Sequence, residues 1–142
     1  MKAIADTFVL VASDCPVTTA VEPAVKGAAP TVPVIQYELL TARPYALTLE
    51  DLIYETHVRR VGLSRAQAKA QAAAIKAELF AKPHACMRAS ALPKRYGWGV
   101  HYDGRGRLAL YAMESEEYRQ FAGGEVAGVK IVPAMRSSRA GR

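Results

Sequence analysis

The sequence is poor in cysteine and contains no long run of apolar residues. Its 142 residues include two cysteines, Cys15 and Cys86, which are too few for a disulfide framework. The apolar stretch near the N-terminus, residues 7–12, lies between Asp6 and Asp14. It is far shorter than the ~20 residues of a membrane span and too short for the core of an export signal. We therefore expect a cytoplasmic protein with reduced thiols that does not enter a membrane.

Motifs for common cofactors and nucleophiles are also missing. The sequence has no Walker loop, no dinucleotide fingerprint, no Gly-x-Ser-x-Gly elbow and no paired-histidine zinc helix. The side chains that could share a metal lack the Cys-x-x-Cys spacing of zinc sites; they are Cys15, His84, Cys86 and His101. We expect neither a cofactor nor a metal.

The overall composition is that of one globular domain. Hydrophobic residues make up 51% of the chain and charged residues 23%, and a chain of this length can bury most of its apolar surface. We predict a single domain over residues 1–139, followed by a flexible tail at 140–142.

The net charge of +6 is concentrated in two segments. Residues 82–107 carry six Lys or Arg and one Asp, and residues 130–142 carry four Lys or Arg and no acid. Clustered positive charge favours an anionic partner, either a nucleic acid or a phosphorylated small molecule. A solvated loop and a disordered basic tail would give the same pattern, and the sequence leaves both interpretations open.

Turn residues divide the first third of the chain into two expected strands. Residues 8–12 read as a strand that ends at the Asp14–Pro16 turn. Residues 34–40 mix β-branched, aromatic and polar side chains and read as a second strand. The proline-rich residues 18–33 between them form a long loop, which is typical of functional or mobile segments.

Two helices are expected in the middle of the chain. Thr48 is a suitable N-cap, Glu50 and Asp51 follow it, and Gly62 suits the C-cap. Ser64 and Gln67 form a capping-box pattern at the start of an alanine-rich helix that reaches residue 82. We interpret the pair as an αα-hairpin, because the second helix is longer than a typical DNA-recognition helix.

The last third reads as a hairpin, a short helix and a strand. Residues 97–102 and 107–112 flank the turn at 103–106. Ser115 would cap a short helix, and residues 129–134 form an edge strand that contains Pro133. The order predicts an α+β fold: one mainly antiparallel sheet covered by the αα-hairpin and one short helix.

A dense group of cations and aromatic rings lies just before this hairpin. Lys94 and Arg95 could meet phosphates, while Tyr96 and Trp98 could stack on bases. On a strand the two rings share one face, and Gly97 and Gly99 share the other. Either the rings bind a ligand or they pack in the core, in which case the arginine face is exposed. The bare glycine backbone suggests that another chain segment or a ligand approaches closely there.

Cations near the C-terminus could extend this surface. Arginine side chains and hydroxyls make a suitable clamp for phosphate or carboxylate. If the last strand pairs beside the hairpin, its end would join the preceding cluster. The expected binding residues are Arg88, Lys94, Arg95, Tyr96, Trp98, His101, Arg136, Ser137 and Arg139. In this hypothesis Tyr96, Trp98 and His101 line the same surface.

An enzyme is the alternative to a binding module. Cys86 has cations on both sides in the sequence, which can stabilise a thiolate. His101 could act as a general base for Cys86 or Ser90 if the fold brings them together. No nucleophile motif surrounds either candidate, so we favour binding over catalysis.

Several strings are similar to those of a family of small uncharacterised bacterial proteins, classed as a domain of unknown function. They are DCP at 14–16, RAS at 88–90, KRYGWGVH at 94–101, ESEEY at 114–118 and AMRSSR at 134–139. The resemblance covers residues 7–139. It implies one compact domain and no established activity.

Overall fold

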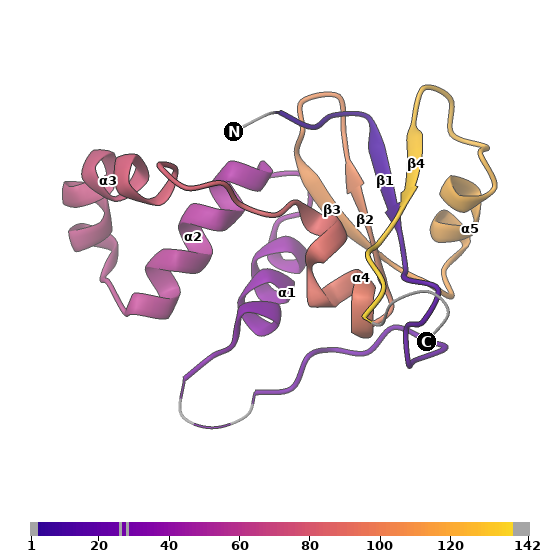
Figure 1. Ribbon diagram of the computed structural model, residues 1–142, viewed down its shortest axis with the longest axis horizontal. Coiled ribbons are helices and arrows are strands. Elements are labelled where there is room, and N and C mark those ends of the chain that lie inside the picture. The colour runs from indigo at the N-terminus through magenta and orange to yellow at the C-terminus, as the bar shows by residue number, and fades with distance from the viewer. Residues whose placement is uncertain (1–2, 26, 28, 138–142) are drawn as a thin grey trace.

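The computed structural model describes residues 3–25, 27 and 29–137. One short strand opens the chain, helices dominate its first two thirds, and the other strands follow (Figure 1). The elements are β1 (Thr7–Leu10), α1 (Val32–Ala42), α2 (Leu49–Val61), α3 (Arg65–Leu79), the 3-10 turn η1 (Met87–Ala89), α4 (Ala91–Arg95), β2 (Trp98–Tyr102), β3 (Leu108–Ala112), α5 (Glu116–Ala122) and β4 (Lys130–Pro133).

In the described part of the chain, four strands form one sheet in the order β3-β2-β1-β4. The β3-β2 and β2-β1 pairs are antiparallel, whereas β1 and β4 are parallel. The predicted α+β class with a mainly antiparallel sheet is confirmed, and so is the edge position of the strand that holds Pro133. The last strand does not pair beside the hairpin, because β1 lies between them.

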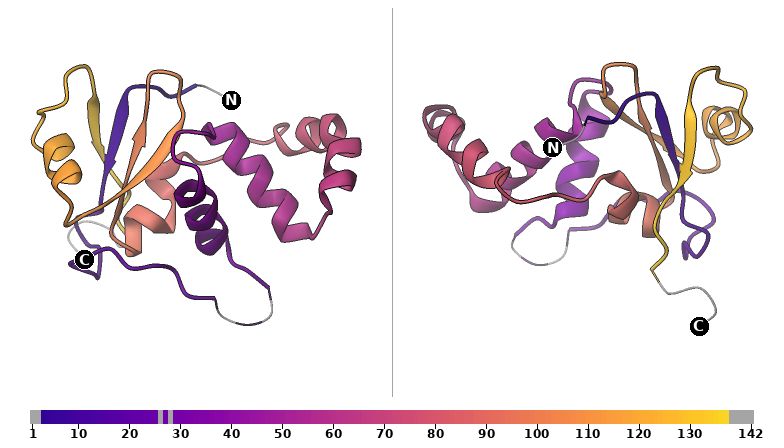
Figure 2. Two further views of the ribbon diagram at one scale, coloured as in Figure 1. Left: turned by 180° about the vertical axis from the view of Figure 1, so that it is seen from behind. Right: turned by 45° about the horizontal axis from the view of Figure 1, so that its top comes forward.

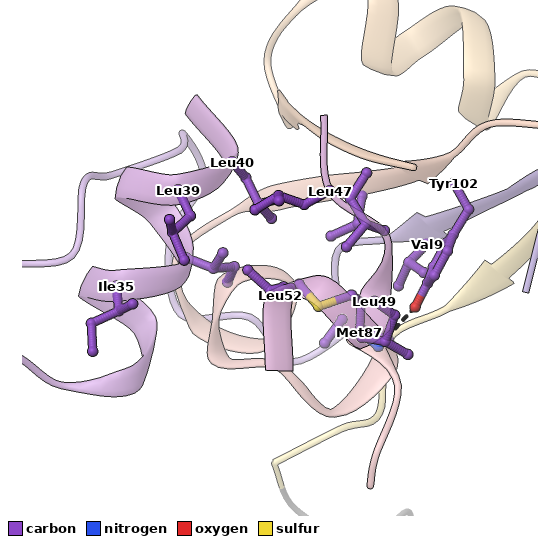
Figure 3. Close-up of a cluster of buried hydrophobic side chains, with 14 residues drawn as sticks. Val9, Ile35, Leu39, Leu40, Leu47, Leu49, Leu52, Met87 and Tyr102 are labelled. Atoms are coloured by element: carbon purple, nitrogen blue, oxygen red, sulfur yellow. Dashed lines mark hydrogen bonds between the residues drawn. The ribbon is translucent and has the colours of Figure 1, made fainter. Parts of the chain in front are cut away.

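The sheet has two differently covered faces, which lie on opposite sides in Figure 1. On one face, here called the helical face, Val9, Val100 and Leu108 pack against aliphatic side chains of α1, α2 and α4 (Figure 3). On the other, here called the α5 face, Phe8 stacks on Phe121 of α5 with ring centroids 4.5 Å apart. Alternation along each strand assigns the side chains to these two faces.

The strand predicted at residues 34–40 is wrong, because this segment is part of α1. Val34, Ile35, Leu39 and Leu40 are buried together, and this spacing matches a helical period and not strand alternation. Pro33 lies in the first turn of the helix, where a missing N–H costs nothing. Packing against α2 and the sheet outweighs the strand preference of the β-branched and aromatic residues.

The predicted helix signals at α2 and α3 are confirmed. Thr48 and Asp51 form a capping box, and Gly62 ends α2 with φ 74°. Ser64 and Gln67 form the second capping box. However, α3 packs on α2 away from the sheet (Figures 1 and 2), and α1 lies against β3 in its place.

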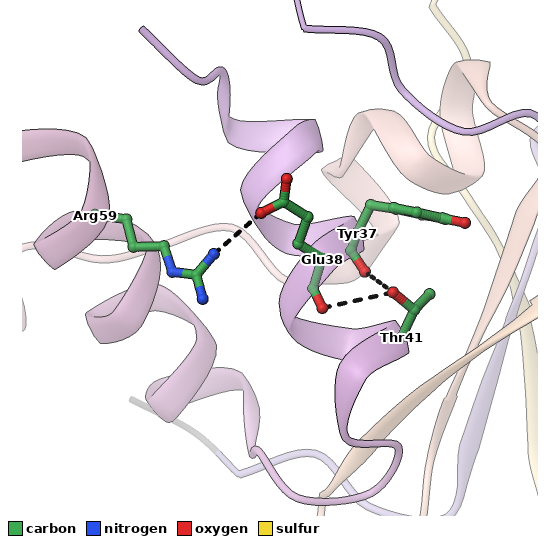
Figure 4. A network of polar contacts seen from close by, with 4 residues as sticks. All are labelled: Tyr37, Glu38, Thr41 and Arg59. Carbon is green, nitrogen blue, oxygen red and sulfur yellow. Dashed lines mark hydrogen bonds and ion pairs between the residues drawn. The ribbon is translucent and has the colours of Figure 1, made fainter.

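Helices α1 and α2 also meet at their exposed sides. Arg59 Nη1 of α2 lies 3.2 Å from Glu38 Oε2 of α1, and both side chains are about half exposed (Figure 4). Such a pair adds little stability in water. The buried aliphatic residues therefore hold the two helices together.

The hairpin and the short helix form as the sequence predicts. Asp103 Oδ1 accepts hydrogen bonds from the N–H groups of Arg105 and Arg107, each at 2.9 Å, and fixes the turn. Ser115 caps α5 through the N–H of Tyr118. None of the helices in the described ranges is long and apolar enough to cross a membrane.

Candidate anion-binding pocket

Arg88 holds the end of the sheet in place. Its Nε–H donates to the carbonyl of Pro133 at 2.7 Å, and its own carbonyl accepts from the N–H of Met135 at 2.8 Å. These two bonds bring η1 against the end of β4, 45 residues further along the chain. The structure thus joins Arg88 to the C-terminal segment that was expected to carry the clamp.

The C-terminal segment stays attached to the fold as far as Ser137. The backbone N–H of Ser137 donates to Asp14 Oδ2 at 2.9 Å. Arg136 is exposed. Arg139 and the tail predicted at 140–142 lie outside the described residues.

A pocket of about 210 Å³ opens on the helical face beside Arg88. Its floor is formed by two rows of side chains across β2, β1 and β4, because the strand register aligns Tyr102 with Thr7 and Thr7 with Lys130. Val9 and Val132 form the adjacent row. We call this the edge pocket; its lining is Ile4, Thr7, Val9, Cys86, Arg88, Tyr102, Lys130 and Val132.

The edge pocket is positively charged. Arg88 and Lys130 are its charged groups, and none of the described residues that line it is acidic. Neither cation forms an ion pair within the described part of the chain. Two unpaired cations from separate segments make a site that an anion can neutralise.

The tyrosine of the edge pocket is neutral and fixed. Tyr102 is 1% exposed, and its hydroxyl accepts from the N–H of Met87 at 3.0 Å (Figure 3). Burial raises the pKa of Tyr102 to about 12, while the hydrogen bond from Met87 acts in the opposite direction. Tyr102 therefore adds no negative charge that would oppose an anion.

Cys86 lies where the edge pocket meets a larger groove of about 550 Å³. Lys82 and His84 line that groove together with Cys86. Cys86 is half-buried and forms no disulfide. Cys86 therefore belongs to the lining of both cavities.

Tyr96 and Trp98 are half-buried and pack against the core, which favours the second of the two interpretations that the sequence left open. The Trp98 Nε1–H donates to the carbonyl of Val21 at 2.8 Å, and its ring lies 5.4 Å from that of Tyr37. The Tyr96 carbonyl accepts from the Val21 N–H at 2.9 Å. These contacts attach the loop after β1, so the rings are not a free stacking platform.

The cations next to these rings do not reach the edge pocket. Lys94 is half-buried and Arg95 is exposed, both in the last turn of α4. Neither side chain lines the edge pocket. The cations that the sequence predicted to form one cluster therefore lie apart: Arg88 lines the edge pocket, whereas Lys94 and Arg95 do not.

His101 lies on the α5 face, opposite the helical face that holds Cys86. Its Nδ1 is 2.8 Å from the hydroxyl of Tyr45, which lies 2.6 Å from that of Tyr111. Burial lowers the pKa of His101, while Asp103 and Asp6 act in the opposite direction. The prediction that His101 shares a surface with Trp98 is wrong, because consecutive strand residues alternate between faces.

The catalytic pairs considered from the sequence do not form. The sheet separates His101 from Cys86. The Ser90 Oγ accepts from the Leu92 N–H at 3.2 Å and donates to Gln36 Oε1 at 2.7 Å, so it serves as the cap of α4. In the parts of the chain that the structure describes, no three His, Cys, Asp or Glu side chains gather as metal ligands.

The sequence predicted that another segment or a ligand approaches the bare glycine backbone closely. At Gly99 it is two aromatic rings that do so. A Cβ at Gly99 would lie 2.5 Å from Cζ of Phe8 and 2.6 Å from Cε2 of Tyr118. The absence of a side chain lets both rings rest on the backbone of β2. The bare strand is a packing surface and not a ligand site.

Sequence reasoning missed Lys130, Tyr102 and Thr7 as lining residues. Alternation along each expected strand could have placed Tyr102 on the face of Val100. The parallel pairing of β1 with β4, which aligns Lys130 with Thr7, has no local signal because the strands lie at opposite ends of the sequence.

The structure defines a small α+β protein with a cationic pocket at the edge of its sheet. A family model described as a family of unknown function, DUF6157, matches residues 1–140, and the chain belongs to this family. No curated protein and no solved structure matches the chain.

Proposed function

We propose that this protein binds a small phosphorylated molecule in the edge pocket. The observation that carries the proposal is that Arg88 and Lys130, from separate segments, line one pocket, and that no acidic residue is among the described residues lining it. Phosphate suits this pair, because guanidinium groups bind its oxygens through two parallel hydrogen bonds and ammonium groups add a compact charge.

The hydrogen bond from Arg88 to Pro133 supports this function. It uses the Nε–H and leaves the two terminal amino groups without partners among the described residues. A guanidinium that is already oriented loses less freedom when it binds a ligand. Arg88 therefore keeps its structural hydrogen bond to Pro133 and still has two terminal amino groups that can donate to a ligand.

The shape of the site favours a small molecule over a nucleic acid strand. A cavity of about 210 Å³ has room for a small phosphorylated molecule but not for a run of nucleotides. Tyr96 and Trp98, which were the expected base-stacking residues, are engaged in packing. Lys94 and Arg95 do not line the cavity.

Calorimetric titration with inorganic phosphate and pyrophosphate at low salt tests this function. We expect saturable binding that weakens as salt is added. Lys130→Gln should lower the affinity about tenfold, because a hydrogen bond to a charged group contributes about 1.5–3 kcal/mol. Arg95→Gln removes the same charge from an exposed position outside the pocket and should leave the affinity unchanged.

Two results would overturn the proposal. Equal losses in Lys130→Gln and Arg95→Gln would show that only the net charge matters. Tighter binding of a mixed single-stranded oligonucleotide than of pyrophosphate, unaffected by Lys130→Gln, would indicate a nucleic acid surface elsewhere.

A further inference from the structure

The groove next to the edge pocket has a lining of different chemistry. It has a volume of about 550 Å³ and involves the segment before β1, the start of α2 and the chain that runs from the end of α3 across to η1 (Figure 1). We call it the apolar groove; its lining is Ile4, Leu49, Phe80, Ala81, Lys82, Pro83, His84 and Cys86. Most of these side chains are aliphatic or aromatic, which suits an apolar ligand surface.

The apolar groove and the edge pocket adjoin each other. Ile4 and Cys86 line both of them, and these two residues come from distant segments of the chain. Arg88 and Lys130 line the edge pocket and not the groove. The combined cavity therefore has a cationic end and an apolar end.

The two cavities lack the side chains that usually recognise sugars and bases. Among the described residues that line them, none is Asp, Glu, Asn or Gln. Carboxylate and amide oxygens are the side-chain acceptors that hydroxyl and amino groups of a ligand need. A sugar or nucleoside would place such groups against Phe80 and Pro83 without partners, which is unfavourable. A hydrocarbon body has no polar groups to satisfy.

Two rings form an ordered wall of the apolar groove. The Phe80 and His84 ring centroids lie 5.6 Å apart at an interplanar angle of 66°. The His84 Nε2–H donates to the carbonyl of Leu79 at 2.7 Å, which holds the ring in place. Phe80 is half-buried, so part of its surface is available to a ligand. A wall that is already ordered loses little freedom on binding.

We infer that the ligand is an amphiphile, a phosphate ester of an apolar alcohol. This inference rests on the function proposed above and names the class of ligand. The phosphate lies between Arg88 and Lys130 in the edge pocket. The hydrocarbon body passes Ile4 and Cys86 at the junction and rests on Phe80 in the apolar groove.

The one lysine of the groove does not compete for the phosphate in this arrangement. Lys82 is exposed, so its ammonium group can stay in water while its apolar stem lines the groove. The edge pocket offers two cations to the same anion, which favours the phosphate there.

Calorimetric titration with methyl, butyl and hexyl phosphate tests the inference on the unaltered protein. We expect the affinity to rise about two- to fourfold for each added methylene group, and so at least about thirtyfold from methyl to hexyl phosphate. Glucose 6-phosphate, which has a polar body, should bind no better than methyl phosphate. The alcohol 1-hexanol, which lacks the phosphate, should bind far more weakly than hexyl phosphate.

Variants separate the two ends of the ligand. Phe80→Ala should weaken hexyl phosphate about fivefold and leave methyl phosphate unchanged. Lys130→Gln should weaken both about tenfold. Val61→Ala, which shortens an apolar side chain that is 54% exposed and lies outside both cavities, should change neither. Circular dichroism confirms that each variant is folded.

The two cysteines report where the hydrocarbon lies. Both are free and half-buried, but only Cys86 lines the two cavities. Hexyl phosphate should slow the alkylation of Cys86 several-fold and leave that of Cys15 unchanged. Mass spectrometry of the separated peptides measures both rates in one sample.

The outcomes distinguish this inference from the function on which it rests. Equal affinities for methyl and hexyl phosphate, each lowered by Lys130→Gln, would overturn the amphiphile and keep the phosphate site. Weakening of hexyl phosphate by Lys82→Gln and not by Lys130→Gln would place the phosphate in the groove and overturn the inference. The absence of binding by every phosphate would overturn the proposed function itself.

Discussion

The two faces of the sheet are covered by different kinds of side chains. On the α5 face, the rings of Phe8, Tyr118 and Phe121 form a thin aromatic layer that is seated on the bare backbone of Gly99. On the helical face, aliphatic side chains make the larger core, and Val132 of β4 is only partly buried against it. The edge pocket lies beside this strand. The helical face thus leaves a cavity beside its edge strand, whereas the stacked rings of Phe8 and Phe121 pack closely on the α5 face.

The largest effect should come from removing a central side chain on either face. Phe8 and Leu108 are both fully buried. We expect Phe8→Ala to cost about 3–5 kcal/mol and Leu108→Ala about 2–5 kcal/mol in the free energy of unfolding. Urea unfolding of both variants measures the difference. A Phe8→Ala cost well below that of Leu108→Ala would show that the aromatic layer adapts to the loss.

A side chain at Gly99 should disturb the α5 face alone. Gly99→Ala places a methyl group against the rings of Phe8 and Tyr118, and we expect a cost of about 1–3 kcal/mol. The matched control is Gly104→Ala, where the nearest atom to a new Cβ is Asp6 Oδ1 at 3.5 Å. Equal thermal unfolding of the two variants would contradict the close fit of the rings.

One tyrosine on each face accepts a backbone hydrogen bond. The N–H of Met87 donates to Tyr102, and the N–H of Val11 donates to Tyr118 at 2.9 Å. We expect Tyr102→Phe to cost about 1–3 kcal/mol, because it leaves a buried N–H without a partner. Tyr118 is less buried, so water can replace its hydroxyl and Tyr118→Phe should cost less. Chemical denaturation of both variants would reveal the reverse order if this account is wrong.

The smallest effect concerns pH and His101. Because burial lowers the pKa of His101 in the fold, the unfolded chain takes up the proton first as the pH falls below about 6.5. The free energy of unfolding should therefore decrease from about pH 7.5 to about pH 5.5. The decrease should be smaller in His101→Gln. An identical pH dependence in both proteins would assign the effect to other groups.

Local chemistry made the helix ends and the hairpin predictable. The capping residues Thr48 and Ser64 act within four residues of their own position, so the local sequence determines where α2 and α3 begin. Residues 34–40 were misread because their β-branched side chains favour a strand locally. Their burial between α2 and the sheet depends on distant residues.

The candidate site was predictable only in part for the same reason. Arg88 stood out through its charge and its neighbours in the sequence. Lys130 did not, because its position beside Arg88 follows from the parallel pairing of β4 with β1. His101 was assigned to the wrong face, although it lies three positions after Trp98 on one strand and alternation places such residues on opposite faces.

The pairing of β1 with β4 also bears on how the protein folds. The two strands meet only after the chain between Leu10 and Lys130 has been arranged, and contacts between such distant segments form late and slowly. We therefore expect the floor of the edge pocket to be completed near the end of folding. A molecule that occupies it would select chains whose first and last strands are already joined, and would protect them against unfolding and proteolysis.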